Sequence, residues 1–261
     1  MAAETSVPLK REIADRYAGH GRYFRGTYSD HGLRSVASYR AQFPLSKTFL
    51  VHGYHPHDAH RYVLIGDQFK EHLTGSILDV GSRENVIKKT LGLDASLVDK
   101  NSASTEPLDL EAGKLPFADG EFDTVVCLDT LEHLDSLHTV VRELLRVARG
   151  RVIISLPNCW RKTFVQMLRG RSTQQAYGLP PERPMDRHKW FFNSEEIEDF
   201  FFYQAGVEKE YPFSISAVRQ HMIPLFSPIR RFFFNLLRPL IPERHLKNIF
   251  VNTTYVVLSR G

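Results

Sequence analysis

Residues 122–156 read FDTVVCLDTLEHLDSLHTVVRELLRVARGRVIISL, and this stretch decides the fold. Its first seven residues form a short run rich in β-branched side chains, which predicts a strand over 122–128. The run RVIISL predicts a second strand over 151–156. Between them a helical repeat places these residues on one face: Leu137, Val140, Val141, Leu144 and Leu145. Apolar strands that alternate with helices indicate a parallel sheet covered by helices.

The opposite face of this predicted helix is charged. We expect four side chains to lie in solvent there: Arg142, Glu143, Arg146 and Arg149. Gly150 is expected to end the helix.

The alternation of strands and helices extends in both directions. Further strands are predicted at 76–80, 95–98, 207–214 and 253–259, and further helices at 56–73, 84–91 and 193–204. Gly92 closes the second of these helices, and Asn193 with Glu196 forms a capping box at the start of the third. The sequence therefore predicts an α/β fold: a doubly wound, Rossmann-like, mostly parallel sheet with helices on both faces.

Composition sets only broad limits. The chain has 261 residues, 42% hydrophobic and 25% charged, which fits one α/β domain. The net charge of +4 is too small to mark a nucleic-acid-binding protein. No stretch approaches the roughly 18–20 apolar residues that span a bilayer, and residues 1–10 lack the apolar core of a secretory signal. With two cysteines, of which Cys127 is expected to be a buried thiol, we expect a soluble cytoplasmic protein.

Acidic residues follow the predicted strands where ligands bind in such sheets, outside the carboxyl ends. Asp79 and Gly81 occupy the turn after the first strand, where a ligand can approach the backbone. Asp99 ends the second strand and is placed to accept hydrogen bonds from both hydroxyls of a ribose. Asp109 is placed to reach the amino group of an adenine.

A series of motifs in this region resembles the class I S-adenosylmethionine-dependent methyltransferases, most closely those that modify small molecules, quinones and lipids. The motifs are LPFADGEFD at 115–123, VVC at 125–127, LEHL at 131–134, LLRV at 144–147, IISLPN at 153–158 and WFFN at 190–193. The resemblance implies S-adenosylmethionine as cofactor and a seven-stranded sheet whose last strand is antiparallel to its neighbours. It covers about 75–160 well and 186–217 loosely. We accordingly expect an N-terminal extension or lid over 1–60 and the methyltransferase domain over 61–261.

The resemblance also implies roles for individual positions. The matching residues are Asp79, Gly81, Ser82 and Arg83 for the methionine end of the cofactor, Asp99 and Lys100 for the ribose, Asp109 and Leu110 for the adenine, and Leu128 and Asp129 for the methyl group. One departure concerns the loop after the first strand, where the family usually has three glycines and only Gly81 is retained. Asn85 tolerates left-handed geometry well. Arg83 either meets the cofactor carboxylate or points into solvent, and the second alternative would indicate a non-catalytic scaffold.

Two histidines are candidate general bases. A base is useful in methyl transfer when the acceptor is a hydroxyl or a protonated amine, since the cofactor already carries an activated methyl group. His133 lies in the LEHL motif, where it could instead orient the turn, and His188 lies in the segment expected to cover the substrate. Residues 52–60 hold four more histidines, but their spacing matches no familiar zinc pattern, so no metal site is predicted there.

A predicted insert over 217–252 separates the last two strands and contains an amphipathic helix that Ser227 and Pro228 begin. Its apolar stripe consists of Ile229, Phe232, Phe233, Leu236, Leu237 and Leu240. The other side carries Arg230, Arg231, Asn235 and Arg238, with Phe234 as an apolar exception, and Pro239 is expected to break the helix near Arg238. The stripe could pack on the domain as a lid or core helix, contact a membrane through 228–241 or form the wall of a lipid site, or join two subunits.

These observations predict an S-adenosylmethionine-dependent methyltransferase acting on a small-molecule, glycan or lipid-linked acceptor, with peripheral membrane association. The alternatives are the non-catalytic scaffold and an RNA or protein methyltransferase. Asp129 to Glu132 read DTLE, where RNA base methylases often carry Asn/Asp-Pro-Pro-Tyr/Phe, and this difference disfavours nucleic acid as the acceptor. Arg169, Arg171 and Arg183 either bind an anionic group or are simply exposed. Neither the acceptor atom nor the oligomeric state follows from the sequence.

Overall fold

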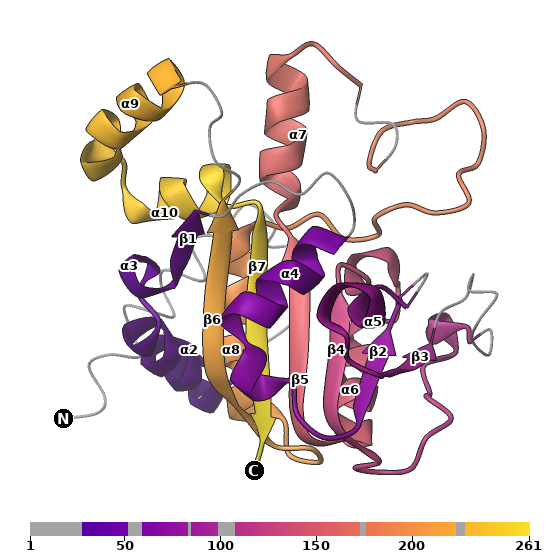
Figure 1. The fold of residues 1–261 in the computed structure, drawn as a ribbon. Helices are drawn as coiled ribbons and strands as arrows, with labels where there is room; N and C mark the ends of the chain where they lie inside the picture. Colours follow the sequence, from indigo (N-terminus) through magenta and orange to yellow (C-terminus); the bar gives the residue numbers. More distant parts are fainter. Residues whose placement is uncertain (1–27, 52–58, 83–84, 99–107, 173–175, 223–227) are drawn as a thin grey trace.

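A computed structural model describes residues 28–51, 59–82, 85–98, 108–172, 176–222 and 228–261 (Figure 1). The strands form one sheet in the order β1-β6-β7-β5-β4-β2-β3. Their bounds are Phe49–Val51 (β1), Ile77–Val80 (β2), Ser96–Val98 (β3), Phe122–Leu128 (β4), Ala148–Pro157 (β5), Phe213–Met222 (β6) and Thr253–Arg260 (β7).

The sheet is mostly parallel. β4 is parallel to β2 and to β5, β2 to β3, and β1 to β6, whereas β7 is antiparallel to both of its neighbours, β5 and β6. The predicted mixed sheet with an antiparallel last strand is therefore confirmed. Of the seven strands that the resemblance implies for the methyltransferase domain, the described residues after 60 supply six. The seventh place in the sheet belongs to β1, which comes from the N-terminal segment.

The middle strands are buried on both faces. Every residue of β2 is buried, and so is every residue of β4 except Asp123. Val125 and Cys127 belong to the core on one side of the sheet, and Val126 and Leu128 to the core on the other. A strand covered on both sides has no face for polar side chains, which explains the nearly continuous apolar run of β4.

Helices cover both cores. α2 (Asp30–Gln42), α6 (Leu137–Val147) and α8 (Ser194–Val207) pack on one face of the sheet. α4 (Ala59–Gln68) and α5 (Val86–Leu91) pack on the other. Figure 1 shows that α7 (Cys159–Leu168) and α9 (Pro228–Leu237) instead project beyond the edge of the sheet at which β5 and β6 end.

Helix termini follow the predicted capping chemistry. Asn85 caps α5 in the left-handed conformation, with φ 46°, and Gly92 closes it with φ 69°. The capping box of Asn193 and Glu196 is present at the start of α8. The predictions for Gly92 and for the capping box are confirmed.

The helix predicted over 56–73 is shorter than expected. α4 ends at Gln68, and a 3-10 turn over Lys70–His72 follows it. The side chains predicted to share its buried face are all buried: Tyr62, Ile65, Phe69 and Leu73. The apolar periodicity therefore continues through the turn although the α-helix does not.

Two predictions about α6 are wrong. Arg146, expected in solvent, is 7% exposed, because its guanidinium donates to the carboxylates of Glu143 and Asp119 and to the carbonyls of Leu115 and Phe117 at 2.7–2.9 Å. A guanidinium with this many acceptors can be buried. The helix also ends before Gly150, since β5 begins at Ala148 and continues the chain as a strand through the glycine.

The strand predicted over 207–214 is misplaced. β6 runs over Phe213–Met222 and pairs with β7 along its length, so the insert between the last two strands begins after Met222 and not at 217. The sequence pattern does not predict this strand, because two of its buried side chains are polar. Gln220 is fully buried and His221 is 2% exposed. Residues 207–212 belong to the end of α8 and to a loop.

The described part of the N-terminal segment packs into the same body. α2 lies against α8, where Ser35 donates from its hydroxyl to the carbonyl of Phe202 at 2.6 Å. β1 adds an edge strand through Phe49, which stands opposite Gln220 of β6. The domain boundary at residue 60 and a lid role for 1–60 stay predictions.

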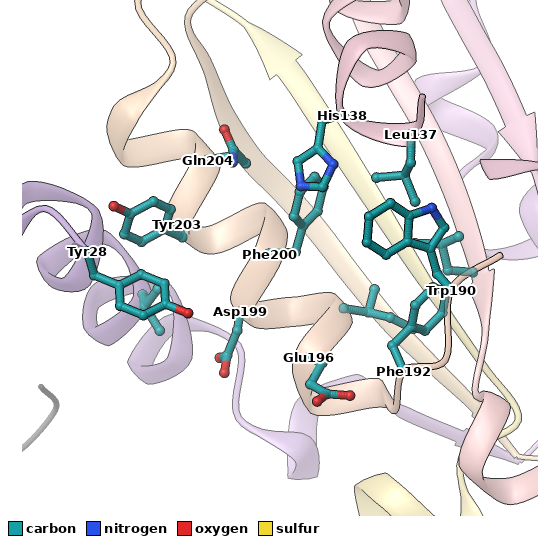
Figure 2. Close-up of a pocket in the computed structure, with 13 residues that line it drawn as sticks. Tyr28, Leu137, His138, Trp190, Phe192, Glu196, Asp199, Phe200, Tyr203 and Gln204 are labelled. Carbon is teal, nitrogen blue, oxygen red and sulfur yellow. The ribbon is translucent and has the colours of Figure 1, made fainter. Parts of the chain in front are cut away.

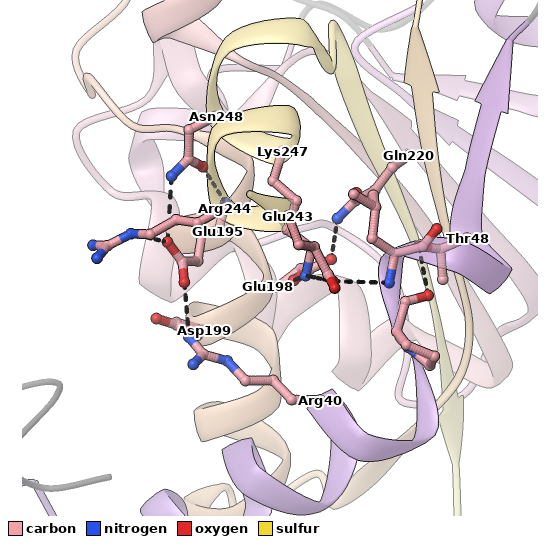
Figure 3. Close-up of polar contacts among 12 residues, drawn as sticks. Arg40, Thr48, Glu195, Glu198, Asp199, Gln220, Glu243, Arg244, Lys247 and Asn248 are labelled. Carbon is pink, nitrogen blue, oxygen red and sulfur yellow. Dashed lines mark hydrogen bonds and ion pairs between the residues drawn. The ribbon is translucent and has the colours of Figure 1, made fainter. Parts of the chain in front are cut away.

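A buried polar network holds the end of the insert against the domain (Figure 3). The Lys247 ammonium donates to the fully buried Glu198 carboxylate of α8 at 2.8 Å, and the side-chain amide of Gln220 from β6 donates to the same carboxylate. Burial raises the pKa of Glu198 to about 7, although the Lys247 charge opposes this rise. Three distant segments of the chain are thereby joined at one carboxylate.

Lys247→Met should lower the free energy of unfolding by about 3 kcal/mol at pH 8, because it leaves a buried carboxylate without its cation. The loss should be smaller at pH 5. A folded-state pKa above the unfolded value means that the folded protein binds more protons between the two pKa values, so stability falls as pH rises through that window. Removing the Lys247 cation raises the folded-state pKa of Glu198 further and so widens this pH range. Urea unfolding at the two pH values measures both effects.

The control for this variant is Lys209→Met, which removes an exposed ammonium and should leave stability almost unchanged. An equal loss of stability for Lys247→Met at pH 5 and pH 8 would contradict the assigned role of Glu198.

Candidate active site

The carboxyl ends of β2 and β4 lie side by side. Asp79 of β2 stands opposite Val126 of β4, and Gly81 directly follows β2 with φ 83°. A Cβ added to Gly81 would lie 2.2 Å from the hydroxyl oxygen of Thr130, so the turns that follow the two strands are in contact. Only glycine combines this left-handed φ with so close an approach.

A buried carboxylate faces this turn from β2. Asp79 is fully buried, and the Tyr62 hydroxyl of α4 donates to it at 3.0 Å. Burial raises the pKa of Asp79 to about 7, and the hydrogen bond from Tyr62 partly opposes this rise. Ser82, the next predicted cofactor residue, is 2% exposed beside them.

A second carboxylate lies at the end of β4. Asp129 has a positive φ of 47° and accepts a hydrogen bond from the Ser155 hydroxyl at 2.6 Å. Arg61 reaches it from α4: its guanidinium donates to the Leu128 carbonyl at 3.0 Å and lies 3.6 Å from the Asp129 carboxylate. The predicted pair Leu128 and Asp129 is thus held under α4, close to the end of β2.

The side chains at these strand ends suit the polar methionine end of S-adenosylmethionine. The Tyr255 hydroxyl is fully buried and has no hydrogen-bond partner among the described residues. Burial raises its pKa well above the ordinary value, with a further contribution from the charge of Asp129. A buried hydroxyl in need of a partner, two carboxylates and one guanidinium are chemically suited to a ligand that carries both an ammonium and a carboxylate.

The structure describes only some of the other predicted cofactor residues. Leu110 is buried in a 3-10 turn over Leu110–Ala112, and Asp109 is exposed and accepts a hydrogen bond from the Glu111 amide at 3.1 Å. Its observed contact therefore caps the turn. Arg83, Asp99 and Lys100 lie outside the described residues, as do the histidines of 52–58.

The structure brings the two predicted bases together. The rings of His133 and His188 meet edge to face, with their centroids 4.7 Å apart. Glu132, which is 1% exposed, completes the group: one ligand atom from each of the three side chains lies within 4.8 Å of the others. Glu132, His133 and His188 are called the Glu–His–His cluster below.

Each imidazole of this cluster is held through its Nδ1 atom. His133 Nδ1 lies 2.8 Å from the Asp186 carboxylate, and His188 Nδ1 lies 2.6 Å from the Tyr177 hydroxyl. Burial lowers the pKa of His188 to about 4, with a further contribution from His133, so His188 is neutral at pH 7. Burial also raises the pKa of Glu132 well above its ordinary range.

Backbone contacts fix the segment that carries His188 onto the LEHL turn. The Lys189 amide donates to the Glu132 carbonyl at 2.7 Å, and the Trp190 indole donates to the Leu134 carbonyl at 2.7 Å. The Cys159 amide donates to the Phe192 carbonyl at 3.0 Å. The cluster is therefore a fixed arrangement of two chain segments far apart in the sequence.

A separate cavity of about 390 Å³ lies between α6 and α8 (Figure 2). Aromatic side chains dominate its lining, among them Trp190, Phe200 and Tyr203. None of the predicted site residues lines it, so we assign it no part in methyl transfer.

The amphipathic helix of the insert exposes its apolar stripe, whereas a core helix would bury it. Phe234, the exception in the pattern, is 8% exposed and packs on Phe250 with ring centroids 4.9 Å apart. The predicted stripe is instead 49–78% exposed: Ile229, Phe232, Phe233, Leu236, Leu237 and Leu240. The prediction that this stripe packs on the domain is therefore wrong. The predicted break holds, since α9 ends at Leu237 and a 3-10 turn over Arg238–Leu240 follows.

α7 exposes a second apolar face on the same side of the molecule (Figure 1). Its side chains Trp160, Phe164, Met167 and Leu168 are 44–71% exposed. These four and the six exposed residues of the α9 stripe are together called the apolar rim. Within the described ranges no helix is both long and apolar enough to cross a membrane. Arg169, Arg171 and Arg183 are exposed, as one of their two interpretations expects.

Several side chains of the site have no role in the sequence-based predictions, among them Glu132, Arg61 and Tyr62. Glu132 has a sequence signal, because it is a carboxylate in the LEHL motif directly before the candidate base His133. Arg61 and Tyr62 have none, since their roles depend on how α4 crosses the ends of β2 and β4.

Gly81→Ala should lower the free energy of unfolding by about 2–5 kcal/mol. Left-handed geometry costs a non-glycine residue about 1–2 kcal/mol, and the overlap with Thr130 adds about 1–3 kcal/mol. Gly92→Ala is the matched control, because Gly92 has a similar φ of 69° with nothing within 4 Å of the added Cβ. Chemical denaturation of both variants measures the difference, and equal losses would show that the two turns do not touch.

Comparison with known proteins agrees with the sequence motifs. Residues 76–155 match the family described as "Methyltransferase domain", which spans β2 to β5 with Asp79, Gly81 and the LEHL turn. Among curated proteins, none matches the sequence.

Several solved structures are similar at low identity. Magnesium protoporphyrin IX methyltransferase from Synechocystis PCC 6803, solved with bound S-adenosylhomocysteine, is 15% identical over 97% of this chain and 100% of that one, with a TM-score of 0.43. A methyltransferase from Archaeoglobus fulgidus is 13% identical over 78% and 95%, with a TM-score of 0.45. One from Thermotoga maritima is 15% identical over 87% and 97%, also with 0.45.

TM-scores below 0.5 do not identify an acceptor, so the assignment rests on the matched domain and on the strand ends that it covers. The scaffold alternative is set aside. Residues 76–155 of this chain match a methyltransferase domain, and the chain is a methyltransferase with S-adenosylmethionine as its cofactor.

Proposed function

We propose that the protein methylates a hydroxyl group of a lipid-linked acceptor at a membrane surface. The observation that carries this proposal is the apolar rim, which is exposed at the edge of the sheet where β5 and β6 end. Exposed apolar patches on this scale mark surfaces that meet a partner or a membrane. An acceptor with an apolar chain would enter the site from the phase that the rim contacts.

The charge of the two helices favours an anionic bilayer as the partner of the apolar rim. Segments 159–171 and 228–241 contain no acidic residue, and their cations are Arg161, Lys162, Arg169, Arg171, Arg230, Arg231 and Arg238. Each Lys or Arg near an anionic leaflet contributes about 1 kcal/mol to membrane binding.

For the cofactor, we infer that Asp79 receives the ammonium group of the methionine end and Arg61 its carboxylate. Both side chains lie at the carboxyl ends of β2 and β4, where the resemblance to class I methyltransferases implies the cofactor loop. The further proposed contacts are Gly81, Ser82, Arg83, Asp99, Lys100, Asp109, Leu110, Leu128 and Asp129. S-adenosylmethionine, when bound, supplies an activated methyl group that needs position and exclusion of water more than activation.

For the acceptor, we propose the Glu–His–His cluster as the place where the hydroxyl binds. Glu132 and His133 lie three and four residues after Asp129 in the chain, near the end of β4 that the resemblance assigns to the methyl group. The side chains of the cluster offer nitrogen and oxygen atoms that can hold a hydroxyl group. His133 and His188 thus act from one site, although they were predicted as alternatives.

Binding of S-adenosylhomocysteine should strengthen by roughly fivefold to tenfold between pH 6 and pH 7.5. The pKa of Asp79 is raised to about 7, so its carboxylate, which we expect to bind the ammonium, is mostly protonated at pH 6 and mostly ionised at pH 7.5. Isothermal titration at several pH values measures this dependence. Asp79→Asn should bind more weakly with a flat profile, and a wild-type slope retained in this variant would assign the titration to the ligand or to another residue.

The membrane proposal predicts that the wild type pellets with vesicles containing phosphatidylserine. Phe232→Glu/Phe233→Glu should lose most of the pelleted fraction, because both side chains are exposed on the apolar rim and would carry charge into the interface. Thr74→Glu/Ala118→Glu is the matched control. It adds the same two charges at exposed positions near the amino ends of β2 and β4 and should pellet like the wild type. Equal pelleting of all three proteins, or none by the wild type, would overturn the proposal.

A further inference from the structure

We propose that Glu132, His133 and His188 bind a divalent transition-metal ion, with Zn²⁺ as the best match, and that this ion holds the oxygen of the acceptor. The binding part of this inference stands on the geometry of the cluster alone. Its role in catalysis rests on the proposed function.

The three side chains offer the ligand set of a catalytic zinc site. Two imidazoles and one carboxylate, with one atom from each within 4.8 Å of the others, provide three ligands on a small ion. Bonds of about 2.0–2.2 Å in tetrahedral geometry place ligand atoms about 3–3.5 Å apart, so a small closing movement suffices. Three protein ligands leave the fourth position open for a substrate oxygen.

The outer partners of both histidines are those that metal-binding histidines have. A carboxylate can only accept, so His133 donates its Nδ1 proton to Asp186, and Nε2 of the neutral ring keeps its lone pair. Nε2 of His188 keeps its lone pair as well in the tautomer whose Nδ1–H donates to the Tyr177 hydroxyl oxygen. Such contacts fix the tautomer and the ring orientation of a metal ligand.

Glu132 is the independent observation that points to a cation. Its side chain is 2% exposed, and its Oε2 atom is buried with no hydrogen-bond partner among the described residues. The other oxygen, Oε1, lies 3.7 Å from Nε2 of His133. With His133 neutral and Glu132 ionised, these two atoms both present lone pairs to each other. A bound cation converts this unfavourable contact into two bonds.

Charges of both signs surround the cluster. The carboxylates of Asp129 and Asp186 and the guanidinium of Arg61 act on Glu132, and the Lys162 ammonium acts on His188. With Glu132 included, the acidic groups outnumber the basic ones by one. The backbone is fixed, since the Lys189 amide is bonded to the Glu132 carbonyl at 2.7 Å. The ligands are therefore held before the ion arrives, which favours binding.

A bound ion would make the acceptor hydroxyl a better nucleophile. Coordination lowers the pKa of the hydroxyl, so its proton leaves to water and the oxygen stays on the metal as an alkoxide. The oxygen then forms a bond to the methyl carbon while the carbon–sulfur bond breaks and its electron pair goes to sulfur. The products are the methyl ether, S-adenosylhomocysteine and one proton.

The test is equilibrium dialysis of the purified full-length protein against Zn²⁺, with metal content measured by mass spectrometry, and titration with Co²⁺ followed by its visible absorption. We expect one ion per chain at this site and the intense absorption of a tetrahedral Co²⁺ site. Glu132→Gln and His188→Ala should each weaken binding at least tenfold. Both variants should first be shown by circular dichroism and thermal unfolding to be folded.

Two controls separate this site from others. His138→Ala removes an imidazole of α6 that lies outside the cluster and should bind Zn²⁺ like the wild type. His55→Ala/His57→Ala tests the histidine-rich segment 52–60, and loss of the Zn²⁺ site in that variant alone would overturn the inference. So would unchanged binding in Glu132→Gln and His188→Ala, or no binding by the wild type. A protein that binds S-adenosylhomocysteine but no Zn²⁺ would overturn the metal inference and leave the proposed function standing.

Discussion

The contact between the Gly81 turn and Thr130 is the constraint on which the site depends. A Cβ at Gly81 would meet the Thr130 hydroxyl at 2.2 Å, so the turns after β2 and β4 can touch only because this residue has no side chain. The contact sets Asp79 and Asp129 at the ends of neighbouring strands, and α4 can then cover both with Tyr62 and Arg61. The close approach of the two backbone turns therefore fixes where these candidate cofactor-binding side chains lie. Each position in turn determines which type of side chain is found there.

Local chemistry was predictable from the sequence wherever a short segment determines its own structure. β4 has its predicted bounds because a strand buried on both faces leaves a continuous apolar run, and Asn85, Gly92 and Asn193 sit at helix ends where capping needs them. Errors arose where burial depends on distant partners. Arg146 is buried through acceptors from residues 115–119, and Gln220 of β6 through a carboxylate on α8. The sequence shows that such a residue is polar, but it does not show whether the fold supplies the hydrogen-bond partners that allow the residue to be buried.

The candidate site shows the same division. The sequence indicated Asp79, Gly81, His133 and His188 separately, since each lies in a motif with its own chemistry. Their contacts were not predictable, because the approach of His188 to His133 depends on how the segment before α8 docks on the LEHL turn through Lys189. The amphipathic helix was misjudged for a related reason. Six apolar residues at helical spacing normally face a core, but a single aromatic, Phe234, anchors α9 and leaves the stripe in solvent.

The apolar rim and the Glu–His–His cluster are joined through one turn. Asn158 caps α7 at the end of β5, and its buried side-chain amide donates to the carbonyls of Lys247, Asn248 and Val251 at 2.9–3.2 Å. The next residue, Cys159, begins the rim-bearing helix and lies 3.9 Å from the ring of His188. The turn thus connects α7, the end of the insert and the cluster without a flexible link. A surface that docks through this helix would hold the cluster at a fixed depth beneath it, which is the geometry that a reaction on a lipid-linked hydroxyl requires.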